Sequence, residues 1–376
     1  MIAEEVASQY ADEVDIAARF PHEAVAALRE SRLLGVMVPR DLGGEGANLA
    51  EIAECCNILG RSCAATGMIY AMHQIQVSGL IPNGAEESWH REFLAHAAAD
   101  QILIASATTE LGVGGDLRRS LCAIERSGDT FSLEKQATVI SYGEVADAFL
   151  ATARTHADAP TSDQVMALIT REQCTLTKIS DWNTLGMRGT CSDGYTLRAK
   201  APVCQILPKA YSSTAARAML AVSHLLWGAL WLGIAADAFS RAQKFIRTEG
   251  TSKSSGPSPA SLRLAAAAGK LQRMTSCLRH AIADYECARH CEKALNSFAF
   301  SIAMNNVKTG LSEIAIEVVQ TALLVCGIQG YRNNSPYSVA RHIRDILSAP
   351  IMINNDRILA NTATLLLMQS PANNLA

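Results

Sequence analysis

Residues 107–116 read A-T-T-E-L-G-V-G-G-D, a glycine-rich stretch with the composition of a ligand-binding loop. A phosphate-binding loop would end in Gly-Lys-Ser/Thr, whereas the charged residues here are Glu110 and Asp116. A dinucleotide-binding turn needs Gly-x-Gly-x-x-Gly between a strand and a helix, and the spacing after Gly112 and Gly114 does not supply it. The stretch therefore needs another explanation.

The sequence E-C-A-R-H-C, residues 286–291, brings metal-ligating side chains together. Helical spacing puts Cys287 and Cys291 on one face, with His290 beside them. A closed zinc site needs further ligands at matching spacing, and no second pair follows. We therefore expect no metal site, and the eleven cysteines, which show no pairing rhythm, indicate reduced thiols.

The composition limits the classes of partner. The chain has 376 residues, a net charge of −3 and 18% charged residues, so no strong field attracts nucleic acid or an anionic membrane. The N-terminus lacks the basic and then apolar layout of a signal peptide. We expect a cytoplasmic protein whose partners are small molecules or other proteins.

Three stretches of different character must position any site. Residues 1–100 have helical periodicity, broken at Pro21, Pro39 and the G-G-E-G turn at 43–46. Residues 101–207 contain short β-prone runs at close spacing, which predicts an antiparallel, barrel-like domain. Residues 208–376 return to long helices, which predicts a four-helix bundle. The fold class is α+β.

The apolar run from Met219 to Ala236 is long enough to suggest a transmembrane helix. It contains Ser223 and His224, and sequence rich in Arg and Lys follows it. A helix that is apolar on all sides can also form the centre of a large bundle. We expect this second arrangement.

Five local motifs occur in a defined order along the chain. They are F-P-H-E-A-V-A-A-L-R-E-S-R-L-L-G-V-M-V-P-R-D-L-G-G-E-G (20–46), T-T-E-L-G-V-G-G-D (108–116), A-T-V-I-S-Y-G-E-V-A-D (137–147), L-G-M-R-G-T (185–190) and C-G-I-Q-G-Y with R-H-I-R-D (326–345). Together with the order of helices, strands and helices, they resemble the acyl-CoA dehydrogenase family. Leu111, Gly115, Val139 and Ile328 depart from its usual residues.

The resemblance implies that the glycine stretch approaches the isoalloxazine ring of FAD, where a Cβ at Gly114 or Gly115 would collide. It implies that Thr109 hydrogen-bonds the pyrimidine end of the flavin. Ile140 would lie against the ring, and Ser141 would aim its hydroxyl at the flavin N5. Without the resemblance, Ile140 and Ser141 read as an ordinary half-buried strand.

The resemblance also implies a binding site for the rest of FAD. Arg247 follows the apolar helix where the family places an arginine on the pyrophosphate, usually from a neighbouring subunit. Gly327 and Gly330 would let the backbone pass close to the ADP half. Asn355 is assigned to cofactor binding on the same resemblance.

The family's catalytic base is missing from both of its usual positions. Dehydrogenation of an acyl thioester needs a group that takes the α proton, yet the two positions hold Ile353 and Ala221. A register shift of one turn would make Asp356 or His224 the base, and as a base His224 could act with a pKa near neutrality. The alternative roles are a helix cap or an intrahelical ion pair for Asp356 and a hydrogen-bonded core residue for His224.

The resemblance implies an FAD-dependent dehydrogenase of an acyl thioester, carried on coenzyme A or an acyl carrier protein. Electrons would pass to an electron-transfer flavoprotein, and a homodimer or homotetramer is expected. Because no base stands in place, two alternatives stay open. One is a flavin-dependent monooxygenase or oxidase on the same fold, and the other is a catalytically silent structural relative.

Overall fold

The computed structural model describes residues 1–84, 88–114, 116–214, 219–249 and 258–368. The chain divides into two compact units. Unit 1 comprises Met1–Ile52, Met68–Thr184 and Arg188–Ser223. Unit 2 comprises Ala53–Gly67, Leu185–Met187 and His224–Ala376.

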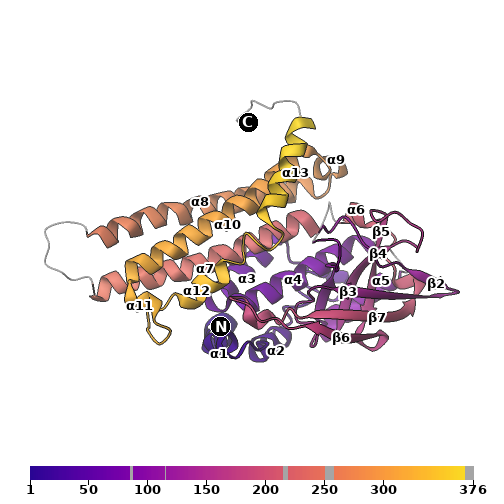
Figure 1. Ribbon diagram of the computed structural model, residues 1–376, viewed down its shortest axis with the longest axis horizontal. Helices are drawn as coiled ribbons and strands as arrows, with labels where there is room; N and C mark the ends of the chain where they lie inside the picture. The colour runs from indigo at the N-terminus through magenta and orange to yellow at the C-terminus, as the bar shows by residue number, and fades with distance from the viewer. Residues whose placement is uncertain (85–87, 115, 215–218, 250–257, 369–376) are drawn as a thin grey trace. The chain divides into compact units, whose positions relative to one another are not determined.

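Helices make up the first hundred residues (Figure 1). They are η1 (Ile2–Ala7), α1 (Ser8–Ala17), α2 (His22–Glu30), η2 (Arg40–Leu42), α3 (Leu49–Ser62), α4 (Ala64–Leu80), η3 (Ile81–Asn83) and α5 (Trp89–Asp100). The predicted breaks lie between them: Pro21 is the N-cap of α2, and Gly43 and Gly46 turn the chain at φ values of 85° and 64°. Glycine adopts this left-handed backbone without a steric penalty.

A buried histidine connects these helices to the first strand. His73 on α4 accepts a hydrogen bond from the Ile104 N–H at its Nδ1 (3.1 Å), so the proton is on Nε2, which donates to the Leu34 carbonyl (2.9 Å). Burial lowers the pKa of His73 to about 4, which keeps the ring neutral.

Two sheets follow, both within unit 1. The strands are β1 (Ile104–Ala107), β2 (Glu125–Ser127), β3 (Thr130–Ala137), β4 (Ala148–Arg154), β5 (Gln164–Thr170), β6 (Cys174–Ser180) and β7 (Gly194–Pro202), with short helices η4 (Arg171–Gln173), η5 (Arg188–Thr190) and η6 (Val203–Gln205) between or after them. One sheet has the order β2-β3-β7-β6 and is antiparallel throughout. The other has the order β1-β4-β5.

The pairing of β1 with β4 is parallel, which differs from the predicted all-antiparallel domain. A parallel pair needs a long crossover, and here β2 and β3 of the other sheet lie within that crossover. β4 pairs with β5 in the expected antiparallel sense. The chain changes from one sheet to the other after β1, after β3 and after β5. Strands adjacent in sequence are therefore not always partners.

Among the residues described after β7, helices predominate, as predicted. The helices are α6 (Tyr211–Thr214), α7 (Leu220–Glu249), α8 (Pro259–Ala288), α9 (Glu292–Leu295), α10 (Phe298–Cys326), α11 (Ile328–Tyr331), α12 (Ala340–Ile346) and α13 (Asn355–Met368). Figure 1 shows α7, α8 and α10 running lengthwise beside one another. α10 packs on α8, α12 and α13, and Gly228 of α7 lies against Leu311 of α10.

Two of these helices, α7 and α10, are long and apolar enough to cross a membrane on length and composition alone, which is weak evidence for a span. The most apolar window of α7 is 83% buried within the protein, whereas that of α10 is 50% buried. The burial of α7 is that of a core helix, as the sequence predicts.

Candidate functional site

The glycine stretch forms a loop tied to the end of β3. Gly112 and Gly114 have φ values of 91° and 59°, in the region that favours glycine; Gly115 lies outside the described residues. Thr109 Oγ1 donates to the Val139 carbonyl (2.8 Å) and accepts from the Val139 N–H (3.2 Å). The hydroxyl predicted to bind a flavin is therefore engaged within the chain and would have to change partner.

Three hydroxyl groups form a chain beside this loop. Ser141 Oγ lies 2.7 Å from Ser192 Oγ, which lies 2.8 Å from Thr190 Oγ1. Ser141 is half-buried, whereas the other two are buried. Hydroxyls linked in this way can reorient together. Ser141 can therefore donate to another group while it accepts from Ser192.

Ile140 is fully buried, and its N–H donates to the Asp193 carbonyl (2.8 Å). A Cβ at Gly143 would lie 3.2 Å from Ile140 Cγ2, so that turn is fitted closely around the isoleucine. In this structure, Ile140 packs as a core residue. Its predicted contact with a flavin stays a prediction.

The backbone next to Ser141 is held in an unusual conformation. Tyr142 and Cys191 have φ values of 46° and 45°, which side chains other than glycine rarely adopt. The Tyr142 N–H donates to the Thr190 carbonyl (2.8 Å) and its hydroxyl to the Ile104 carbonyl (3.0 Å). Such strain costs about 1–3 kcal/mol per residue and persists only when surrounding contacts fix it. The Ser141 turn is thus rigidly set.

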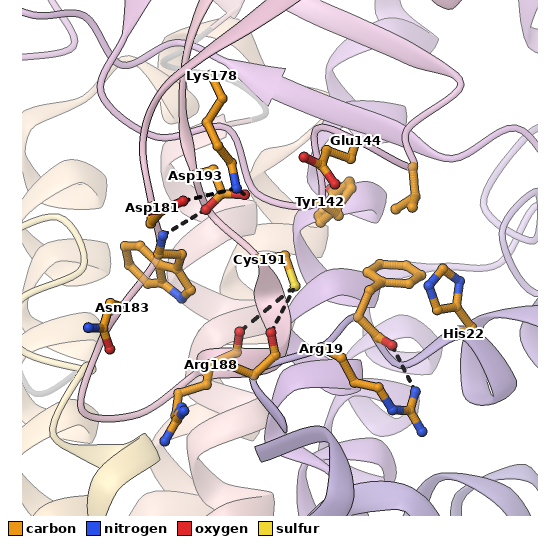
Figure 2. Close-up of a pocket in the computed structure, with 14 residues that line it drawn as sticks. Arg19, His22, Tyr142, Glu144, Lys178, Asp181, Asn183, Arg188, Cys191 and Asp193 are labelled. Atoms are coloured by element: carbon orange, nitrogen blue, oxygen red, sulfur yellow. Dashed lines mark hydrogen bonds and ion pairs between the residues drawn. The ribbon is translucent and has the colours of Figure 1, made fainter. Parts of the chain in front are cut away.

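A pocket of about 470 Å³ opens beside the same turn (Figure 2), lined by residues 18–22, 142–145 and 178–193. Its charges are largely paired: Lys178 binds Asp181 (3.1 Å) and Asp193 (2.9 Å), and Arg19 binds Glu13 and Glu23 (both 2.9 Å).

Burial raises the pKa of the Cys191 thiol in this pocket to about 11, so it is not a thiolate nucleophile at neutral pH. Sequence reasoning missed this pocket, because its walls come from separate segments. Trp182, which reads as a packing residue in the sequence, is one of its lining residues.

The residues predicted to bind the ADP half of FAD lie in unit 2. Arg247 is exposed in the last turn of α7. The next residue, Thr248, pairs its hydroxyl with that of Tyr337 (2.6 Å), and this connects the end of α7 to the segment before α12. Gly327 ends α10 at φ 55° and ψ −135°, a conformation essentially restricted to glycine. Gly330 is buried, and a Cβ there would lie 2.7 Å from Cys326 Cβ, so packing alone requires a glycine.

His224 is fully buried in the bundle. Its Nδ1 donates to the Met304 carbonyl (3.2 Å), which leaves Nε2 unprotonated and without a partner among the described residues. Burial lowers the pKa of His224 to about 3. The pKa near neutrality considered for His224 as a base is therefore wrong, because desolvation disfavours the imidazolium. A buried, weakly basic imidazole suits a core role better than proton abstraction.

Asp356 is exposed in the first turn of α13, where its N–H is bound by Asn354 Oδ1 (2.7 Å). Asn354, rather than Asp356, therefore caps α13. The Asp356 carboxylate, in the first turn, still interacts favourably with the helix N-terminus. Of the two candidate bases, Asp356 is the one that solvent can reach.

Asn355 lies in a buried network with a lysine that sequence reasoning missed. Lys308 Nζ donates to Asn355 Oδ1 (2.7 Å) and to the carbonyls of Ile353 (2.8 Å) and Ala349 (3.1 Å). The amide nitrogen of Asn355 donates to Ser312 Oγ (3.0 Å). Asn355 thus uses its polar atoms within the bundle. Lys308 holds the segment that contains Ile353, the position of the family's missing base.

Two protein-family models match the chain. A model described as "Acyl-CoA dehydrogenase, N-terminal domain" matches residues 1–101, and one described as "Acyl-CoA dehydrogenase, C-terminal domain" matches residues 225–353. The chain is 26% identical over 353 residues to "Probable acyl-CoA dehydrogenase FadE25" of Mycobacterium tuberculosis, covering 92% of this chain and 87% of the relative.

Two solved structures share the fold. Butyryl-CoA dehydrogenase from Megasphaera elsdenii has a TM-score of 0.80 at 20% identity, covering 97% of this chain and 95% of the other. FMN-bound TdsC from Paenibacillus sp. A11-2 has a TM-score of 0.85 at 18% identity, covering 99% and 98%; another structure of TdsC is titled a dibenzothiophene monooxygenase. The protein is an α+β protein with the acyl-CoA dehydrogenase fold. It belongs to the acyl-CoA dehydrogenase family.

Proposed function

We propose that the protein is an FAD-dependent oxidoreductase that forms a double bond between Cα and Cβ of an acyl thioester, on coenzyme A or on an acyl carrier protein. The observation that carries this proposal is the family match at both ends of the chain, together with the relative FadE25 over 92% of it. The neighbour TdsC, bound to FMN, supports a flavin site on this fold.

The residues present fit a flavin at several positions. Gly112, Gly114 and Gly327 have positive φ values, which favour glycine, and a glycine has no Cβ to hold a ligand away. Ser141 offers a half-buried hydroxyl backed by Ser192, and Arg247 an exposed guanidinium suited to a pyrophosphate.

When bound, FAD supplies the acceptor for the electrons and hydrogen that leave Cβ. The chain's own contribution is the Ser141 hydroxyl, which donates a hydrogen bond where negative charge develops. Its link to Ser192 and the strained Tyr142 turn keep that hydroxyl oriented.

The α proton needs an acceptor, and we assign it to the Asp356 carboxylate. This group is exposed, whereas His224 is buried with a pKa lowered to about 3. A carboxylate base takes an α proton efficiently only when it lies within hydrogen-bond reach of it in the substrate complex. The Lys308 network fixes the residues just before Asp356 and would help to hold it in place.

The proposal also includes assembly and electron transfer. We propose a cytoplasmic protein. We also propose a homodimer or homotetramer, because the resemblance implies that a neighbouring subunit completes the FAD site. The electrons would leave to an electron-transfer flavoprotein.

A spectral experiment tests this function. Protein produced with ample riboflavin is purified, its bound flavin identified, and a panel of acyl thioesters added without oxygen. We expect the visible flavin absorbance to bleach with one class of acyl thioester. Bound flavin that no thioester bleaches would count against dehydrogenation, and colourless protein that takes up no FAD would leave the silent structural role.

A flavin-dependent monooxygenase is the second candidate, favoured by one specific observation. The two positions where the family carries a glutamate base hold Ile353 and Ala221, and monooxygenation by reduced flavin and oxygen needs no base there. The fold neighbour TdsC is titled a monooxygenase. Oxygen consumption with externally reduced flavin, in the absence of thioester bleaching, would favour this candidate.

A further inference from the structure

Glu110, the acidic residue at the start of the glycine stretch, is a buried anchor. It is 5% exposed, and its carboxylate accepts four hydrogen bonds. The donors are Ser120 Oγ (2.7 Å), the Leu121 N–H (3.0 Å), the Cys122 N–H (2.6 Å) and Lys135 Nζ (2.9 Å). A single side chain thus joins the two ends of the segment 110–122, which contains the glycines.

Lys135 on β3 extends this anchor into the sheets. Its side chain is 0% exposed, and beyond Glu110 its ammonium donates to the Thr152 carbonyl on β4 (3.0 Å) and lies 3.4 Å from the Thr152 hydroxyl. All three N–H directions of the ammonium therefore have acceptors. The pair connects the glycine segment to one strand from each sheet of unit 1.

The energetics make this pair sensitive to single changes. Burial by itself would raise the pKa of Glu110, but the Lys135 charge and the hydrogen bonds from Ser120, Lys135 and Leu121 lower it overall, so the carboxylate stays ionised. Removing one partner of a buried ion pair leaves an uncompensated charge, whereas replacing both by apolar residues is often neutral for stability. This difference lets a folding role be separated from a positioning role.

We propose that Lys135 is a positioning residue for cofactor binding: through Glu110 it fixes the segment 110–122, and thereby the glycine backbone that a flavin contacts. This inference rests on the proposed function. Without the Glu110–Lys135 pair, the segment keeps two other hydrogen bonds to its surroundings. The Leu111 N–H donates to the Gln136 carbonyl (2.8 Å), and the Ser120 N–H donates to the Thr161 carbonyl (2.9 Å). The protein then folds with a loosened glycine loop.

The test compares FAD dissociation constants, from equilibrium dialysis of protein stripped of flavin, for wild type, Lys135→Met, Glu110→Gln and the double variant Lys135→Met/Glu110→Leu. The matched control is Arg198→Met, which breaks the exposed pair Arg198–Glu134 (2.9 Å) in the same sheet. Thermal unfolding and hydrogen exchange of residues 111–121 are measured on the same samples.

We expect both single variants to bind FAD at least tenfold more weakly and to exchange faster in the segment, with the control unchanged. The double variant is expected to be more stable than either single variant, because no uncompensated buried charge is left. It is not expected to regain FAD affinity, because a leucine cannot accept the Leu121 and Cys122 N–H groups. FAD affinity that returned together with stability would show a merely structural role and overturn the proposal.

Equal FAD affinity in wild type and Lys135→Met would also overturn the proposal that Lys135 is a positioning residue. Wild-type protein that takes up no FAD would overturn the proposed function as well. If Lys135→Met fails to fold, the double variant decides between the two roles.

Discussion

At the scale of single residues, the first question is which group takes the α proton, because Ile353 stands where the family carries a glutamate base. Asp356 is exposed in the first turn of α13, and His224 is buried with a pKa of about 3. We predict that Asp356→Asn slows anaerobic bleaching by roughly 10² to 10⁴, the range typical of losing a general base. His224→Gln should leave the pH dependence of that rate unchanged, because its imidazole does not titrate between pH 5 and 8.

Stopped-flow absorbance measures both rates, with Asp284→Asn on α8 as a partly exposed control. Bleaching of the Asp356→Asn variant at the wild-type rate would exclude Asp356 as the base. A limb of the pH profile that disappeared in the His224 variant would reinstate the histidine.

Lys308 gives a second prediction at this scale. Burial lowers the pKa of Lys308 to about 8 from 10.5. Between these pH values the unfolded chain binds more protons than the native chain. The contribution of Lys308 to the free energy of unfolding therefore rises with pH from about 8 to about 10.5 and is constant below pH 8.

We predict that Lys308→Met removes this rise and destabilises the protein by roughly 3 kcal/mol or more, because three buried acceptors lose their donor. Urea unfolding at several pH values measures it. Lys270→Met, which breaks the partly exposed Lys270–Glu317 pair on the same bundle, should change little. An identical pH dependence in wild type and Lys308→Met would show that another group titrates.

At the scale of elements, the turn at 185–187 leaves no room for a side chain at Gly186. The Met187 N–H donates to Asp345 Oδ1 (2.6 Å), and a Cβ at Gly186 would collide with the Arg344 carbonyl. We predict that Gly186→Ala destabilises by about 1–3 kcal/mol through overpacking. Gly269→Ala in the middle of α8 meets open space and should stabilise by about 0.5–1 kcal/mol. Thermal unfolding compares the two, and equal shifts would contradict the packing argument.

The sequence predicted the order of helices, strands and helices and the buried helix α7, because hydrophobic periodicity and proline and glycine breaks are local signals. It did not predict the parallel pairing of β1 with β4, since partner choice depends on contacts 44 residues apart, such as Ile104 with Ala148. The Ser141–Ser192 and Glu110–Lys135 contacts are non-local in the same way. Burial, which decides the pKa of His224, is also a tertiary property.

At the scale of the whole molecule, the homo-oligomer is the untested expectation. The apolar window of α10 is only 50% buried, and Leu324 near its end is 63% exposed. We predict that sedimentation gives a dimer or larger species, and that Leu324→Asp shifts it toward monomer while Gln320→Glu does not. A monomeric wild type at micromolar concentration would contradict this expectation.

The proposed chemistry depends on whether the intact protein holds a flavin that exchanges electrons with an acyl thioester. Anaerobic titration of the purified, FAD-loaded protein with a panel of acyl thioesters measures this directly in the visible flavin absorbance. We predict that one class of thioester bleaches the flavin and yields the enoyl product. A protein that takes up no FAD, or a loaded flavin that stays oxidised with every thioester, would contradict it.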